Sequence, residues 1–134
     1  MTAVVALLEK VYPDGRSVYV TDASLRASHR ALTTPPYDNI GLPYHAIDKT
    51  LMDATAKFNE GIATLSFALP SAGIVFEKGT RLRLAITGAD KDNVVQRELN
   101  PPPTVTLYSG KGKLSKLSLP MVKSGTALKR YSGT

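Results

Sequence analysis

Alternating apolar and polar residues predict β-strands at the start of the chain. Residues 3–12 form an apolar run that two charged residues interrupt, and residues 17–21 alternate with a period of two, as on a half-buried strand. Residues 13–17, with the sequence Pro-Asp-Gly-Arg-Ser, lie between them and have turn chemistry. Proline presets φ, aspartate bonds its own backbone and glycine accepts a positive φ. The pattern predicts an antiparallel hairpin.

The same alternation returns later in the chain. It is clearest in residues 81–87, where Leu82, Leu84 and Ile86 share one face. Residues 25–30 either extend the second strand or form a strand of their own. The remaining predicted strands are residues 62–69, 74–76, 104–108 and 114–119. About eight short strands separated by turns indicate an all-β sandwich or barrel, not an alternation of helices and strands.

Residues 31–61 are the least regular part of the sequence. Pro35, Pro36 and Pro43 oppose both a helix and a central strand. A short helix is predicted near residues 51–57. Because so long an irregular stretch is uncommon in a compact domain, it is expected either to form a functional surface or to cross between two sheets.

The 134 residues fit a single domain that can bury roughly two-thirds of the surface its unfolded chain exposes. We predict that residues 1–122 form the β-sandwich and that residues 123–134 form a disordered basic tail. The formal charge of +6 arises after Glu98, the last acidic residue. The basic residues beyond it are Lys111, Lys113, Lys116, Lys123, Lys129 and Arg130. Such an end can attract an anionic partner, although a solvated hairpin and tail is the simpler interpretation.

The N-terminal apolar run, residues 3–8, is too short to span a bilayer, and no membrane partner is predicted. No basic residue precedes it, so it is also a poor signal peptide. In a fragment this end would carry no targeting information, so the compartment stays open, with the cytoplasm slightly favoured. The sequence has no cysteine, which excludes disulfides, zinc thiolates and a cysteine nucleophile.

Candidate catalytic chemistry is sparse. No Gly-x-Ser-x-Gly motif is present, and an all-β pattern has no strand–turn–helix to hold such a nucleophile. His29 and His45 are more simply structural histidines, although a triad is recognised by geometry, not by order. Residues 90–93, Asp-Lys-Asp-Asn, could offer oxygen ligands to calcium but lack the spacing of an EF-hand. We therefore predict no catalytic residue, no metal and no cofactor in this chain.

The aromatic residues bear on two possible binding functions. Tyr108 near the basic end could stack on a base, but there is no run of interleaved aromatics, and nucleic-acid binding is not predicted. Tyr37, Tyr44 and His45 lie together in the irregular stretch and could form a sugar-binding platform at a loop tip. The plainer interpretation is that they pack this loop down, or against another domain.

Several segments in order resemble the C-terminal domain of the X-prolyl dipeptidyl peptidase and cocaine esterase family. The similarity covers about residues 3–122. The segments that carry it are Pro-Asp-Gly-Arg-Ser at 13–17, Val-Thr-Asp at 20–22, Leu-Arg-Ala-Ser-His-Arg at 25–30, the run at 69–86, the polar loop at 88–93, and residues 103–108 and 117–120. The sequence departs from the family pattern at residues 58–61 and at Thr80.

The resemblance implies a jelly-roll β-sandwich, similar to a galactose-binding domain, that packs on an α/β-hydrolase domain and a helical cap. It implies that the catalytic Ser, Asp and His lie upstream, and that this domain helps to shape a cleft for X-Pro peptides or acyl esters. The parent would be a serine hydrolase, of dipeptidyl-peptidase or esterase type, while this chain alone is not an enzyme. The candidate docking or cleft-facing residues are Arg26, His29, Arg30, Tyr37, Tyr44 and His45, and the exposed face could also support a homo-oligomer.

Overall fold

The computed structural model describes residues 3–54, 61–88, 100–101, 104–112 and 114–122. The chain divides into two units, residues 1–103 and residues 104–134.

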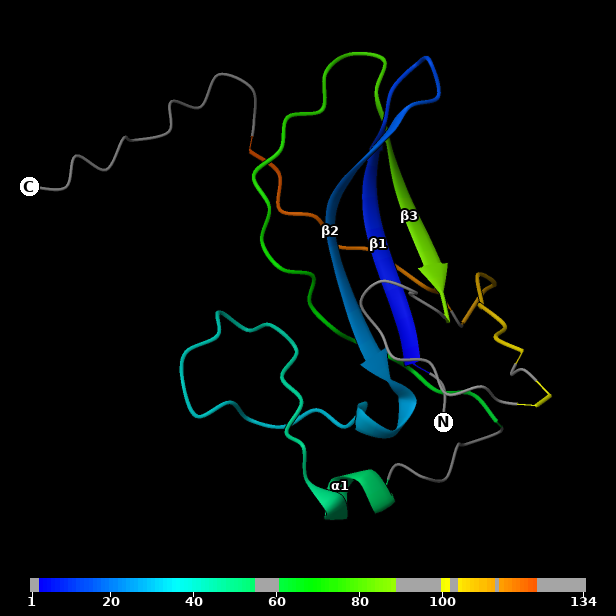
Figure 1. The fold of residues 1–134 in the computed structure, drawn as a ribbon. Helices are drawn as coiled ribbons and strands as arrows, with labels where there is room; N and C mark the ends of the chain where they lie inside the picture. Colours follow the sequence, from blue (N-terminus) through cyan, green and yellow to red (C-terminus); the bar gives the residue numbers. More distant parts are fainter. Residues whose placement is uncertain (1–2, 55–60, 89–99, 102–103, 113, 123–134) are drawn as a thin grey trace, which may run out of the picture. The chain divides into compact units, whose positions relative to one another are not determined.

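The first unit is built on an antiparallel sheet of three strands in the order β2-β1-β3 (Figure 1). The strands are β1 (Ala3–Val11), β2 (Ser17–Arg26) and β3 (Arg81–Thr87). The described helices are short: a 3-10 turn, η1 (Ala27–His29), and one α-helix, α1 (Lys49–Ala54). Strands therefore dominate the regular structure, which confirms the mainly-β fold class.

The β1–β2 hairpin forms as the sequence predicts. The Tyr12 amide donates to the Arg16 carbonyl over 2.8 Å, and the Gly15 amide donates to the Tyr12 carbonyl over 2.9 Å. Asp14 Oδ1 accepts from the Arg16 amide over 2.9 Å, and Gly15 has a φ of 87°, which glycine adopts without a Cβ clash. The second strand continues to Arg26, so the first part of residues 25–30 extends β2 and η1 ends it.

The register places Leu8 and Lys10 of β1 on one face of the sheet, whereas Val5 and Val11 lie on the opposite face. Leu8 lies opposite Thr21 on β2 and Leu84 on β3, and Lys10 lies opposite Leu82. Residues directly opposite each other in a sheet share a face, so Leu8, Lys10, Thr21, Leu82 and Leu84 lie on the same side, which we call the apolar face. The buried apolar residues of the described chain are Val5, Ala6, Leu8, Val11 and Leu25.

The segment that leads into β3 crosses the apolar face. Thr21 Oγ donates to the Pro70 carbonyl over 3.0 Å, and Lys10 Nζ donates to the Val75 carbonyl over 2.6 Å. We call residues 70–77 the crossing segment. The predicted strands at residues 62–69 and 74–76 are wrong in this structure, apart from a single bridge residue, Ile62. Two backbone carbonyls of the crossing segment bond side chains of the sheet, so they do not join a strand ladder.

The irregular stretch contains the predicted helix, which begins earlier than expected. Asp48 Oδ1 accepts from the amides of Thr50 and Leu51, over 2.7 and 3.1 Å, and so caps the first turn of α1. The part of the helix prediction at residues 55–57 lies outside the described residues.

The second unit shows a reversal but no strand ladder among its described residues. The amide and the hydroxyl of Ser115 both donate to the Tyr108 carbonyl, over 3.1 and 2.9 Å. This closes the predicted hairpin at one point. The predicted strands at 104–108 and 114–119 are not formed, because no regular series of backbone bonds accompanies that contact in the described part of this unit.

We predict that Leu8→Ala lowers the free energy of unfolding by about 2–5 kcal/mol, because it leaves a cavity in the middle of the central strand. The Leu8 residue is 6% exposed. Urea unfolding of this chain followed by circular dichroism measures the change. The control Ile47→Ala removes a side chain from a residue that is 87% exposed and is expected to cost no more than about 0.5 kcal/mol. Equal losses in the two variants would contradict the assigned core.

Candidate functional site

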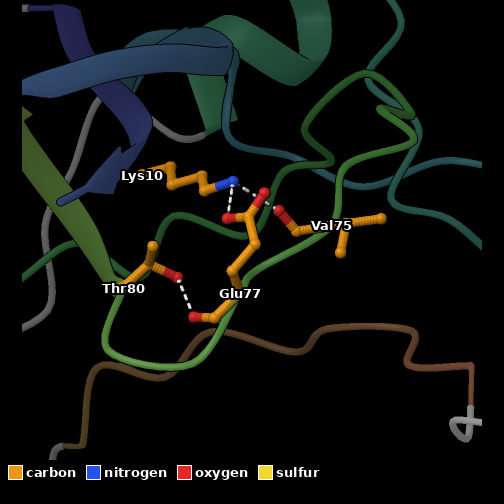
Figure 2. A network of polar contacts seen from close by, with 4 residues as sticks. All are labelled: Lys10, Val75, Glu77 and Thr80. Atoms are coloured by element: carbon orange, nitrogen blue, oxygen red, sulfur yellow. Dashed lines mark hydrogen bonds and ion pairs between the residues drawn. The ribbon is translucent and has the colours of Figure 1, made fainter.

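A buried lysine is the most unusual polar feature of the sheet (Figure 2). Lys10 projects from the central strand onto the apolar face and is 4% exposed. Its ammonium forms an ion pair with the Glu77 carboxylate and donates to the Val75 carbonyl. Both partners belong to the crossing segment. A buried cation is tolerated only when it is paired and hydrogen-bonded, and Lys10 has both kinds of partner.

Two aromatic rings complete the surroundings of this ammonium. Lys10 Nζ lies 5.0 Å from the ring centroid of Tyr12 and 5.9 Å from that of Phe76, within the range of a cation–π interaction. The hydrogen bond with Glu77 is the main cause that raises the pKa of Lys10 above its usual value of 10.5. The same bond lowers the pKa of Glu77 below 4.5. The pair is therefore charged on both sides across the neutral range.

A second ion pair lies on the opposite face of the sheet. Arg83 Nε donates to Glu9 Oε2 over 2.6 Å, and the Ser17 hydroxyl donates to Glu9 Oε1 over 2.8 Å. These two hydrogen bonds, that of Arg83 first, lower the pKa of Glu9. The contacts join all three strands through one carboxylate.

A shallow hollow of about 320 Å³ lies beside this second pair. It is lined by Val11, Arg81, Leu82 and Arg83. The hollow contains no nucleophile and no histidine among its lining residues. Both ion pairs have a structural role. The Lys10–Glu77 pair holds β1 to the crossing segment, and the contacts of Glu9 with Arg83 and Ser17 hold β1 to β3 and β2.

The sequence analysis did not identify Lys10 as a site residue. The available signal was the pair of charged residues, Glu9 and Lys10, that interrupts the apolar run of residues 3–12. In a half-buried strand successive side chains face opposite sides, so one of two adjacent charges must point toward the apolar side. The partner, Glu77, is far away in the sequence, and nothing local identifies it.

The candidates on β2 and η1 lie in one short stretch. Arg26 ends β2 and is exposed, and Arg30 Nη1 donates to the Ala27 carbonyl over 2.8 Å. The Ser28 hydroxyl lies 3.1 Å from His29 Nδ1. This is a contact between sequence neighbours in one turn, and neither residue lines the hollow beside Val11 and Arg83.

The loop candidates are brought together. The rings of Tyr37 and Tyr44 meet edge to face, with centroids 5.8 Å apart and an interplanar angle of 83°. His45 lies between two backbone carbonyls, with Nδ1 3.2 Å from that of Ala31 and Nε2 2.8 Å from that of Ser66. The His45 ring thus ties the loop to the segment that follows α1. This contact supports a structural interpretation of the histidine.

Residues 31–47, which we call the 31–47 loop, are closed at the base and apolar at the surface. The Thr33 amide donates to the Tyr44 carbonyl over 3.0 Å. At the tip, Ile40 has a φ of 54°, a conformation that β-branched residues rarely adopt. Five large apolar residues of the loop are exposed: Leu32, Tyr37, Ile40, Leu42 and Ile47. An ordered loop with this surface is suited to contact another protein surface.

Metal and membrane chemistry find no support in the described residues. No group of three or more potential metal ligands occurs there, and residues 90–93, whose oxygen ligands were considered for calcium, lie outside them. None of the described helices is long and apolar enough to cross a membrane. The basic residues after Lys116 also lie outside the described part of the chain.

These features define a mainly-β domain whose polar contacts hold its own segments together and whose exposed apolar loop suits contact with another surface. Residues 1–116 match the family model described as the X-Pro dipeptidyl-peptidase C-terminal non-catalytic domain. The chain belongs to this family.

Two curated relatives extend the comparison. They are proteins of Mycobacterium bovis and Mycobacterium tuberculosis, each named "Putative serine esterase". Each is 36% identical to this chain over 120 residues, which cover 87% of this chain but 18% of the relative. The chain thus spans less than a fifth of the length of these relatives. No solved structure matches.

We predict that the stability contributed by the Lys10–Glu77 pair is lost in acid. The folded-state pKa of Glu77 is lowered, so its contribution is complete above its unfolded pKa, near 4.5, and disappears as the pH falls through the folded value. Urea midpoints of the unchanged chain and of Glu77→Gln should differ at pH 7, and the difference should shrink as the pH falls below 4.5.

The matched control is Lys78→Gln, which changes a neighbouring charge. No partner of Lys78 is found within the described residues. Its difference from the unchanged chain should stay nearly constant over the same pH range. A Glu77→Gln difference that is as large at pH 3 as at pH 7 would show that the carboxylate charge does not stabilise the fold.

Proposed function

We propose that this chain is the non-catalytic C-terminal β-domain of a multidomain serine hydrolase. Two matches together carry the proposal. Residues 1–116 match a family described as a non-catalytic C-terminal domain, and the chain covers only 18% of the length of each serine esterase relative. A segment of that size in a larger hydrolase is an accessory part, and the catalytic serine belongs to the rest of the parent protein.

For the architecture, we propose that the three-stranded sheet is one layer of a jelly-roll sandwich resembling a galactose-binding domain. The sheet has an apolar face that needs a cover. On β3, Leu82 and Leu84 are 38% and 39% exposed, so the crossing segment covers this face only in part. The domain in this proposal extends over residues 1–122, and residues 123–134 are a disordered basic tail.

Within the parent protein, this domain packs on the α/β-hydrolase domain and shapes its substrate cleft. The proposed docking residues are Arg26, His29, Arg30, Tyr37, Tyr44 and His45. These residues belong to two neighbouring stretches of the chain, which supports the choice. One stretch is the end of β2 together with η1, and the other is the 31–47 loop. An association of two copies through the same face is the corresponding proposal for the isolated chain.

The parent is proposed to hydrolyse acyl esters or X-Pro amides. The names of the two relatives support an ester substrate, and the family description supports an X-Pro peptide substrate. Both substrate classes therefore belong in the test.

A second candidate function is a free-standing sugar-binding module. The edge-to-face contact of Tyr37 with Tyr44, beside His45, is the observation that favours it. The two functions differ in the parent gene, because only a hydrolase carries a Gly-x-Ser-x-Gly motif upstream.

We predict that the full parent protein reacts with a fluorophosphonate probe on a serine outside the segment described here, and that it hydrolyses p-nitrophenyl acetate or an X-Pro p-nitroanilide. Replacing the labelled serine with alanine abolishes both signals, whereas His29→Gln and His45→Gln keep the labelled serine reactive. Mass spectrometry of the labelled peptide locates the site. Labelling of a serine within residues 1–134, or binding to a glycan array without any hydrolysis, would contradict the proposal.

A further inference from the structure

We propose that Ile40, at the tip of the 31–47 loop, is the apolar anchor that docks this domain on the catalytic domain of its own chain. This inference rests on the proposed function and makes it specific: it names the element of the docking surface that buries most on assembly. Sequence analysis did not include Ile40 among the docking residues.

The first argument is the exposure of the loop tip. Ile40 is 83% exposed, and its neighbours Tyr37 and Leu42 are 60% and 46% exposed. Single exposed apolar residues need no explanation, but several in one ordered loop form a patch, and such patches mark interaction sites.

The second argument is that the tip is held rigidly in an unfavourable conformation. Asp38 Oδ1 accepts from the Ile40 amide over 2.9 Å, and Asn39 Nδ2 donates to the Leu42 carbonyl over 2.6 Å. The Leu42 amide donates back to the Asn39 carbonyl over 3.1 Å. These bonds hold Ile40 at a φ of 54° and Gly41 at 76°. Strained backbone persists where its surroundings determine it, and it occurs most often at functional sites.

The third argument concerns charge. From Thr34 to Tyr44 the only charged side chain is that of Asp38, and its carboxylate bonds the backbone of the loop. An apolar tip without free charges has the composition of the buried centre of an interface, where aromatic residues are enriched and charged residues are depleted. The loop therefore suits a stable contact more than a solvated surface.

The choice of the catalytic domain as the partner of this loop is argued from the length of the relatives. The chain covers 18% of the serine esterase relatives, so most of such a protein lies outside this segment. A domain joined covalently to a much larger one meets it at a high effective concentration, which favours an intramolecular contact over a second copy. Preorganisation of the tip favours the same contact, because little ordering is left to occur on docking.

The test uses the full parent protein with a photoreactive residue, Ile40→benzoylphenylalanine. The matched control is Val75→benzoylphenylalanine, since Val75 is a branched residue with 73% exposure outside the loop. After irradiation, mass spectrometry should find crosslinks from position 40 to catalytic-domain peptides in monomeric protein, at least tenfold more abundant than those from position 75. Equal yields from both positions, no crosslink, or crosslinks mainly to a second copy would each overturn the inference.

A second measurement needs no crosslinker. Ile40→Asp should lower the midpoint of thermal inactivation of the parent, whereas Ile40→Leu should leave it unchanged, because only the first places a charge in the contact. An unchanged midpoint in both variants would count against the anchor.

The two proposals can fail separately. If the parent reacts with the fluorophosphonate probe but position 40 does not crosslink to the catalytic domain, the hydrolase assignment stands and the anchor falls. If no serine is labelled and no substrate is cleaved, the hydrolase assignment falls whatever position 40 contacts.

Discussion

The contact on which the described fold most depends is the ion pair between Lys10 and Glu77. It connects the central strand to a segment that arrives from far along the chain and then leads into β3. Because Lys10 is buried on the apolar face, its charge must be matched where it lies, and the carboxylate and carbonyl that match it fix the path of the crossing segment. On the neighbouring strand, the Thr21 hydroxyl also bonds a backbone carbonyl of the crossing segment, that of Pro70.

This constraint explains how a sheet with polar side chains on both faces keeps one register. A shift of β1 by one residue would exchange Glu9 and Lys10 between the two faces, and each would lose its partner. Glu9 would leave Arg83 and Ser17, and Lys10 would leave Glu77. Two adjacent residues with opposite charges thus specify the register more strictly than the apolar residues beside them, since a misplaced valine loses less than a buried, unpaired charge.

Local sequence was enough for the features that depend on nearby residues. The hairpin turn at residues 13–17, the alternation of β3 and a short helix in the irregular stretch were all predictable, because turn chemistry and periodicity act over a few residues. Residues 62–69 alternate equally well but form no ladder, since alternation reports which side is covered and not which backbone groups are paired. The partnership of Lys10 with Glu77 and the edge-to-face contact of Tyr37 with Tyr44 depend on tertiary packing, and no local pattern predicts them.

The distribution of these contacts over the first unit also separates its structural part from its interaction part. The two ion pairs that hold β1, Lys10 with Glu77 and Glu9 with Arg83, belong to the sheet and to the crossing segment, and the buried apolar residues belong to the sheet. The tip of the 31–47 loop differs: the side chains of Asp38 and Asn39 bond the backbone of the loop, and the large apolar residues Tyr37, Ile40 and Leu42 are exposed. A domain that only had to fold would gain stability by burying those side chains, and their exposure agrees with the proposed contact between this loop and the rest of a larger protein.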